Sequence, residues 1–171
     1  NERLTECNAV LEALIPNRSH FTIIGVDEQT TDTPEYSNLP DYYDTRARGL
    51  GGKVASCAEE SILCDRQRDR WRGESICVHE FSHTISIYGL YTADPSFEAR
   101  LQDAWQSAMN AGLYRNTYAT ENAQEYWAEG VQTWYDTNLQ ASPANGVHNE
   151  INTRRELEAY DPKLYALIDE L

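Results

Sequence analysis

Residues 76–85 read ICVHEFSHTI and hold two of the four histidines of the chain. His79 and His83 stand four residues apart, so on a helix both imidazoles lie on one face and can reach one metal ion. Glu80 follows the first histidine and flanks the same ion. Apolar residues on the other side of the stretch predict a helix that packs against a core.

Two histidines and a glutamate in this spacing are typical of a catalytic zinc site. Zinc lowers the pKa of a bound water towards about 7. Glu80 can then accept the proton of that water as a general base. A catalytic zinc takes a third protein ligand and keeps one position open. A third histidine six residues after His83 would supply that ligand, but this position holds Gly89, and the next histidine is His148.

Carboxylates farther along the chain are the better candidates for the third ligand. Glu121, Glu125 and Glu129 follow one another at intervals of four and share a face of a helix predicted over 122–138. One of them should bind the metal ion, and another can orient a ligand histidine through a hydrogen bond. We expect His148 to lie in an exposed loop, although it could line a cleft.

The remaining pattern predicts a small sheet followed by a mostly helical half. Strands are expected over 21–26 and 53–56, with a long polar loop between them. Residues 65–72 are highly charged and should be exposed. Gly89 is a plausible C-cap of the metal-binding helix. We therefore predict one α+β domain over 1–171, with helices at 2–14, 75–88, 96–112, 122–138 and 163–170.

The composition excludes several classes of protein. The chain carries 28 acidic and 14 basic residues, a formal net charge of -14, which argues against a nucleic-acid partner. No apolar run approaches the about 18 residues that a membrane-spanning helix needs. No signal segment opens the sequence, and its start at Asn1 suggests a mature or trimmed form.

Four cysteines without a CxxC pair predict two disulfides and therefore an oxidising compartment. Three pairings are possible. We expect a local Cys57–Cys64 loop and a long Cys7–Cys77 bridge. The alternative is four free thiols in a cytosolic protein.

Taken together, these motifs resemble the gluzincin peptidases of the anthrax lethal factor type, a group that includes the bacterial Pro-Pro endopeptidases. The resemblance rests on the HEFSH motif at 79–83, on Tyr118, and on Glu125-Tyr-Trp-Ala-Glu129, which begins seven residues after that tyrosine. The upstream Arg48-Gly-Leu-Gly-Gly52 is similar to the glycine-bearing approach to the substrate-binding strand of those proteins. The resemblance covers roughly residues 45–135.

The resemblance implies a zincin-like metallopeptidase fold and a role for several residues. Glu125 would be the third zinc ligand, and Glu129 would hydrogen-bond a ligand histidine. Tyr118 would stabilise the oxyanion of the reaction, with Tyr114 as its rival. An edge strand at Val54 and its neighbours would pair with the backbone of the substrate; the residues expected to bind the substrate are Gly51, Gly52, Lys53 and Val54.

These expectations combine into a secreted, monomeric endopeptidase with one catalytic zinc ion and a peptide or protein substrate. The first alternative is a zincin-like module that binds a peptide or glycan without cutting it. The second is a disulfide-braced structural domain in which the HExxH motif is incidental.

Overall fold

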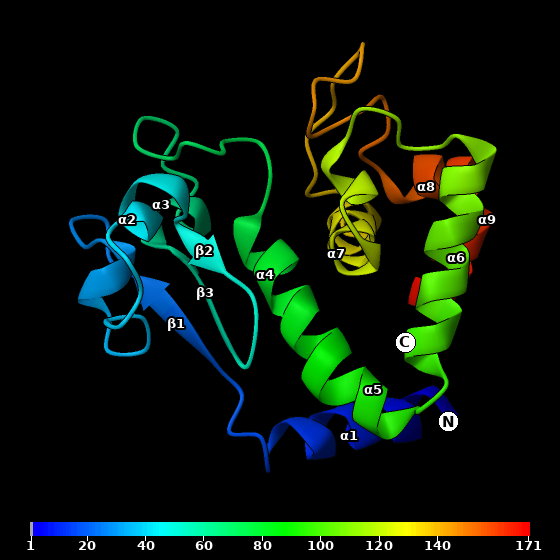
Figure 1. The fold of residues 1–171 in the computed structure, drawn as a ribbon, viewed down its shortest axis with the longest axis horizontal. Coiled ribbons are helices and arrows are strands. Elements are labelled where there is room, and N and C mark those ends of the chain that lie inside the picture. Colours follow the sequence, from blue (N-terminus) through cyan, green and yellow to red (C-terminus); the bar gives the residue numbers. More distant parts are fainter. Residues whose placement is uncertain (1) are drawn as a thin grey trace.

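The structure, a computed structural model, describes residues 2–171 and the side chains of residues 8–171. A small sheet lies on one side of helix α4 (Ile76–Thr84), and α7 (Ala123–Trp134) lies on the other side (Figure 1). Helix α4 packs against both the sheet and α7. The α+β class predicted from the sequence is therefore confirmed, with the HExxH stretch on a helix at the centre of the molecule.

The sheet has three strands in the order β1-β3-β2, which makes β3 (Val54–Ala58) the central strand. Strand β1 (His20–Ile24) runs parallel to β3, and β2 (Gly49–Leu50) runs antiparallel to it. The predicted edge strand at Val54 is therefore misplaced. The chain folds back after β2 and β3 pairs with it, so β2 forms the edge of the sheet next to α4. In β3, the Val54 carbonyl already accepts a hydrogen bond of 2.9 Å from the Tyr36 hydroxyl.

Short helices surround the sheet. Helices α2 (Tyr42–Arg46) and α3 (Glu59–Ile62) flank β2 and β3, and the 3-10 turn η1 (Thr30–Asp32) interrupts the predicted polar loop. Helix α1 (Glu2–Leu14) packs on the π-helical segment η2 (Ile85–Leu90), which continues α4 and leads into α5 (Tyr91–Ala93).

Gly89 therefore lies inside a continuing helix and is not a C-cap, so that prediction was wrong. A Cβ atom at this position would lie 2.7 Å from a methyl group of Val10 in α1. Glycine is required here because two helices approach each other closely.

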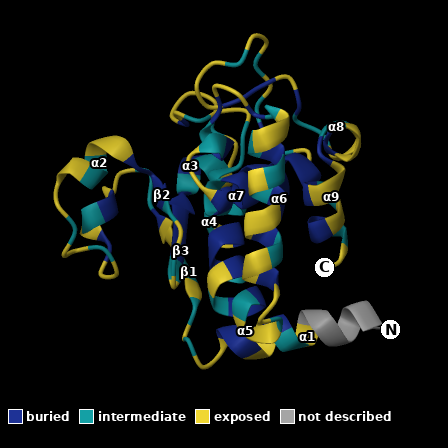
Figure 2. Cartoon of the chain, turned by 45° about the vertical axis from the view of Figure 1, so that its right-hand side comes forward, coloured by how far each residue is buried: buried dark blue, intermediate teal, exposed yellow. Residues whose placement is uncertain are grey.

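The helical half surrounds α7, whose residues are almost all buried (Figure 2). Trp127, Tyr126, Phe97, Leu157 and Leu164 are among the most deeply buried side chains of its core. Around α7 lie α6 (Phe97–Ala111), η3 (Tyr118–Thr120), α8 (Arg154–Tyr160) and α9 (Pro162–Asp169). None of the described helices is long and apolar enough to cross a membrane.

A disulfide joins Cys57 of β3 to Cys77 of α4. Both predicted pairings, Cys57–Cys64 and Cys7–Cys77, are therefore wrong. Cys57 is fully buried and faces α4, whereas Cys64 lies beyond α3, is exposed and has a free thiol. The side chain of Cys7 lies outside the described residues. The bridge fixes the sheet to the helix that carries His79 and His83.

Removing this bridge should destabilise the protein strongly. The bridged cysteines are separated by 20 residues, and cross-links that close loops of this size stabilise by about 3 kcal/mol. We expect Cys57→Ala/Cys77→Ala to lose about this much free energy of unfolding in denaturant titrations. The matched control, Cys64→Ser, should stay within about 0.5 kcal/mol of wild type. Equal losses in both variants would contradict this role of the bridge.

Candidate metal centre

Helix α4 presents two histidines from one face. Ser75 caps its N-terminus by accepting a hydrogen bond from the Val78 amide. His79 and His83 are 7% and 8% exposed, and their ring centroids lie 5.0 Å apart. The i, i+4 spacing thus places both imidazoles in one buried corner, next to α7.

Helix α7 contributes a carboxylate from its first turn. The Asn122 side chain caps this helix by accepting hydrogen bonds of 2.9 Å and 3.0 Å from the amides of Gln124 and Glu125. The positive end of the helix dipole therefore lies beside the Glu125 carboxylate. The indole of Trp127 donates to the carbonyl of Ser82 over 3.1 Å, which fixes α7 against α4.

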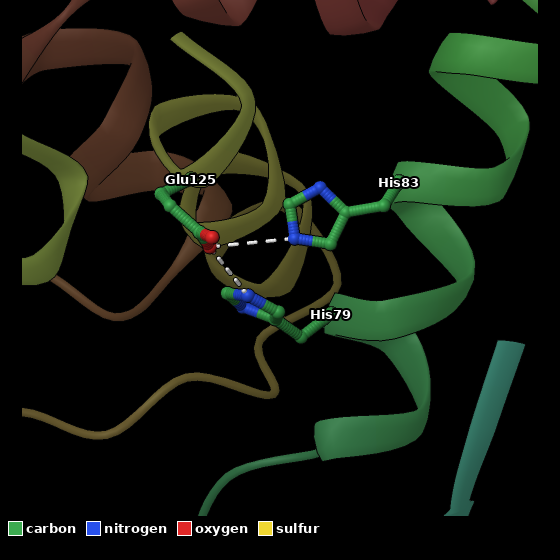
Figure 3. Close-up of side chains that lie close together, drawn as sticks. All are labelled: His79, His83 and Glu125. Atoms are coloured by element: carbon green, nitrogen blue, oxygen red, sulfur yellow. Dashed lines mark hydrogen bonds and ion pairs between the residues drawn. The ribbon is translucent and has the colours of Figure 1, made fainter. Parts of the chain in front are cut away.

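These two helices bring His79, His83 and Glu125 together (Figure 3). The Glu125 Oε2 atom lies 3.0 Å from His79 Nε2 and 3.3 Å from His83 Nε2, and all three ligand atoms lie within 4.8 Å of one another. Two atoms bound at about 2.0–2.1 Å to one tetrahedral ion would lie about 3.3 Å apart. Two imidazoles and one carboxylate therefore fit a divalent metal ion in both chemistry and spacing.

The other ring nitrogen of His79 has its own partner, the side chain of Gln132. His79 Nδ1 lies 2.8 Å from Gln132 Oε1, which can only accept, so Nδ1 carries the proton and Nε2 faces Glu125. Glu129, the residue expected in this role, lies farther away, with Oε1 at 3.6 Å from Nδ1. We did not foresee Gln132, although it stands seven residues after Glu125, two turns along the same helix face.

Acidic groups outnumber basic ones in this corner. Burial lowers the pKa of His79, but the hydrogen bond to Glu125 and the charges of Glu80 and Glu129 outweigh it and raise that pKa to about 9. Burial raises the pKa of Glu125, yet its bonds to His79 and His83 prevail and hold it well below the usual range. Burial also raises the pKa of Glu129. A divalent cation would offset this concentration of carboxylates.

The side chain of Glu80 extends from α4 towards strand β2. A Cβ atom at Gly49 would meet Ile76 at 2.5 Å, and one at Gly51 would meet His83 at 2.7 Å and the Glu80 carboxylate at 2.9 Å. The glycines thus let the strand lie directly against the helix. Burial raises the pKa of Glu80, while the histidines and the backbone amide of Gly51 oppose the shift. A carboxyl group with a raised pKa is suited to accepting a proton.

Tyr118 lies on η3 and faces the same corner. Its ring stacks on His79 with centroids 6.3 Å apart. Burial and the nearby Glu125 carboxylate raise the pKa of Tyr118 to about 12, so the phenol keeps its proton at neutral pH and can donate it in a hydrogen bond. The rival Tyr114 packs against Tyr126 and Tyr160 in the core.

The three converging side chains, Glu80 and Tyr118 line one cleft with a volume of about 710 Å³. One wall is built from residues 46–52, including Gly51 and Gly52, while Lys53 and Val54 are not part of the lining. The floor and the other wall include His79, Glu80, His83, Tyr118 and Glu125. The candidate metal centre is therefore open to a ligand from one side.

His148 lies behind the metal centre, not in an exposed loop as expected. It is 7% exposed, and its Nε2 and Nδ1 atoms lie 3.5 Å from Glu74 and 3.9 Å from Glu129. Glu121, the remaining candidate for the third ligand, is exposed, and it is not part of the cleft lining. The residues next to His148 in the sequence are largely polar, so they did not indicate that its side chain would be buried.

Comparison with known proteins shows that the chain is similar in fold to a solved structure. No family model matches the chain, and no curated protein matches its sequence. Among solved structures, the Pro-Pro endopeptidase PPEP-2 from Paenibacillus alvei shares the fold with a TM-score of 0.58 and 14% sequence identity. The alignment covers 99% of this chain and 86% of that one.

Proposed function

We propose that this chain, which shares the fold of a Pro-Pro endopeptidase, is a zinc-dependent endopeptidase. One observation carries the proposal. His79, His83 and Glu125 converge within 4.8 Å beside Glu80, in a cleft that is open to a ligand. A buried structural metal site would need neither the cleft nor the adjacent carboxylate. A preference for Pro-Pro bonds is not part of the proposal.

The donor set favours zinc among the common divalent ions. Imidazole nitrogens suit zinc better than magnesium or calcium, and three protein ligands with an open position are typical of catalytic zinc. When bound, zinc supplies Lewis-acid polarisation of a carbonyl and lowers the pKa of a water.

Glu80 acts as the proton carrier of the proposed reaction. Its carboxylate accepts a proton from the attacking water and then delivers it to the amine that leaves the cut peptide bond. Because burial raises the pKa of Glu80, the protonated form that must donate to the amine is easier to reach.

Tyr118 stabilises the negative charge that develops on the attacked carbonyl oxygen, through its phenol hydrogen. We expect Tyr118→Phe to lower kcat by about 100-fold with little change in KM, because the bond forms mainly in the transition state. Tyr114→Phe is the matched control and should leave kcat unchanged. A similar kcat in both variants would remove Tyr118 from the mechanism.

Gln132 orients His79 for the metal ion. We expect Gln132→Ala to weaken zinc affinity by about 10-fold to 100-fold, measured by competition with a chelator, because the free imidazole can rotate or change tautomer. The control is Gln106→Ala on α6, where the side chain donates a hydrogen bond to the exposed Asn110. Unchanged zinc affinity in Gln132→Ala would show that the hydrogen bond does not orient the ligand.

We propose that the substrate binds along the outer edge of β2. An extended peptide can add to this edge as a further strand. Gly51 and Gly52 line the cleft, and the lack of a side chain at Gly51 leaves room for Glu80 and His83 beside this segment. Because β3 is central, the proposed pairing with the substrate lies at 49–51 and not at Lys53 and Val54.

We further propose that the chain is a secreted monomer that folds as one catalytic domain over 1–171. The disulfide between Cys57 and Cys77 supports an oxidising compartment. Reduction of this bond under native conditions should loosen α4 from β3.

The direct test is cleavage of a mixed peptide library by the purified, zinc-loaded chain, read by mass spectrometry. We expect new peptide termini that disappear after the metal is removed by a chelator and return when zinc is added. Binding of peptides without any cleavage would favour the non-cutting peptide- or glycan-binding module instead.

A further inference from the structure

A group of arginines stands out in this acidic chain. Residues 66–72 read RQRDRWR and hold four of the chain's 14 basic residues. The arginines of this segment are exposed, as is Arg46 at the end of α2. We call Arg46, Arg66, Arg70 and Arg72 the basic lip.

One member of the basic lip, Arg46, lines the cleft, and the segment 66–72 is attached beside it. Arg46 and Trp71 line the cleft. The Arg70 guanidinium donates to the carbonyl of Thr45 over 3.2 Å, which fixes the segment beside the end of α2. Figure 1 shows this segment as the loop that leads from α3 to the start of α4, on the same side as α2.

The basic lip forms no salt bridge within the described part of the chain, where no carboxylate lies within ion-pairing distance of its four guanidinium groups. Burial raises the pKa of Glu60, but Arg48 and, to a smaller extent, the charge of Arg70 lower that pKa on balance.

Nearby carboxylates have partners of their own. Asp65 pairs with Arg68, and Glu60 pairs with Arg48. The Asp69 carboxylate accepts a hydrogen bond from the Trp71 amide, and Glu74 faces His148. The basic lip therefore keeps donors free for a ligand.

We propose that the basic lip binds an acidic segment of the polypeptide substrate, next to the part that enters the cleft. The inference rests on the proposed peptidase function. Guanidinium groups bind carboxylates through paired, charge-assisted hydrogen bonds. With a net charge of -14, the chain repels acidic polypeptides over most of its surface, so the lip would steer them towards the cleft.

Continuity with the cleft favours a polypeptide over other polyanions. Arg46 belongs to the basic lip, and Trp71 lies within the segment 66–72 that carries the other three arginines of the lip. Both residues also line the cleft that would hold the peptide. A substrate strand that extends along β2 therefore reaches the basic lip without leaving the surface. The lip thus favours substrates with Asp or Glu on one side of the bond that is cut.

The first test measures binding without cleavage in a Glu80→Gln background. Two decapeptides carry a neutral fluorophore, one alternating Glu with Ala and the other Gln with Ala, and binding is read by fluorescence anisotropy. At low salt we expect the Glu peptide to bind about tenfold more tightly than the Gln peptide. Adding Arg66→Glu/Arg72→Glu should abolish this preference.

The matched control is Arg155→Glu/Lys163→Glu, which reverses two charges at the starts of α8 and α9. This pair should keep the preference for the Glu peptide, and circular dichroism should show that both double variants fold. Equal binding of the two peptides to the Glu80→Gln chain, or a preference that survives Arg66→Glu/Arg72→Glu, would overturn the inference.

Two further outcomes would also overturn it. A DNA oligonucleotide that binds the lip as tightly as the Glu peptide would make the lip a general polyanion site. A dimer in sedimentation that Arg66→Glu/Arg72→Glu dissociates would assign the lip to a second copy of the acidic chain.

A peptide library separates this inference from the proposed function. We expect Asp and Glu to be enriched on one side of the cut sites of wild type, and the enrichment to vanish in Arg66→Glu/Arg72→Glu. Cleavage without this enrichment would defeat the inference and leave the peptidase intact. Preferred binding of the Glu peptide with no cleavage would defeat the peptidase and leave the lip as an acidic-peptide site.

Discussion

Glu80→Gln lowers kcat/KM on any peptide that the wild type cuts by about 10²-fold to 10⁴-fold, the usual contribution of a general base. The amide of glutamine has the shape of the carboxylate but cannot accept the proton of the attacking water. Glu80 is not one of the three converging ligands, so the variant should still bind one zinc ion with nearly the affinity of wild type. Steady-state kinetics and a zinc titration measure the two effects separately.

The control for this variant is Glu158→Gln, an exposed position on α8 that is not part of the cleft lining. It should leave both kcat/KM and zinc affinity unchanged. If Glu80→Gln kept full activity, another group would have to carry the proton, and the assignment of Glu80 would be wrong.

Glu125→Ala should have the largest effect on the metal ion. We expect zinc affinity to fall by more than about 100-fold, because loss of a ligand should exceed the loss that follows removal of a group that only orients one. The increase in thermal stability that zinc gives to wild type should disappear at the same zinc concentration. Chelator competition and thermal melting with and without zinc measure these changes.

Glu121→Ala provides the matched control, since Glu121 lies one turn before Glu125 but is exposed and outside the cleft lining. Zinc affinity should not change in this variant. Strong zinc binding by Glu125→Ala together with loss of binding in Glu121→Ala or Glu129→Ala would move the third ligand to another carboxylate.

Local patterns predicted most of the longer helices and the way they present their charged residues. The i, i+4 spacing of His79 and His83 requires only a helix, and the same is true of the carboxylates of α7. Helix α7 ends earlier than expected, at Trp134. Helix α8 was missed, although Thr153 and Glu156 form a capping box that marks its start in the sequence.

Contacts between distant segments could not be predicted in the same way. The Cys57–Cys77 bridge depends on how β3 lies against α4, which sequence spacing does not encode. Strand β2 lies at an edge of the sheet because β3 pairs with β1 on one side and with β2 on the other. His148 is buried because two separate segments, carrying Glu74 and Glu129, meet around it. Each of these features arises from packing between elements.

The most direct test of the central claim is the zinc content of the purified wild-type chain, measured by elemental analysis after exposure to zinc and removal of the excess. We predict about one zinc ion per chain, held by the three converging side chains. A chain that retains no zinc under these conditions would contradict the metal centre, and with it the proposed peptidase.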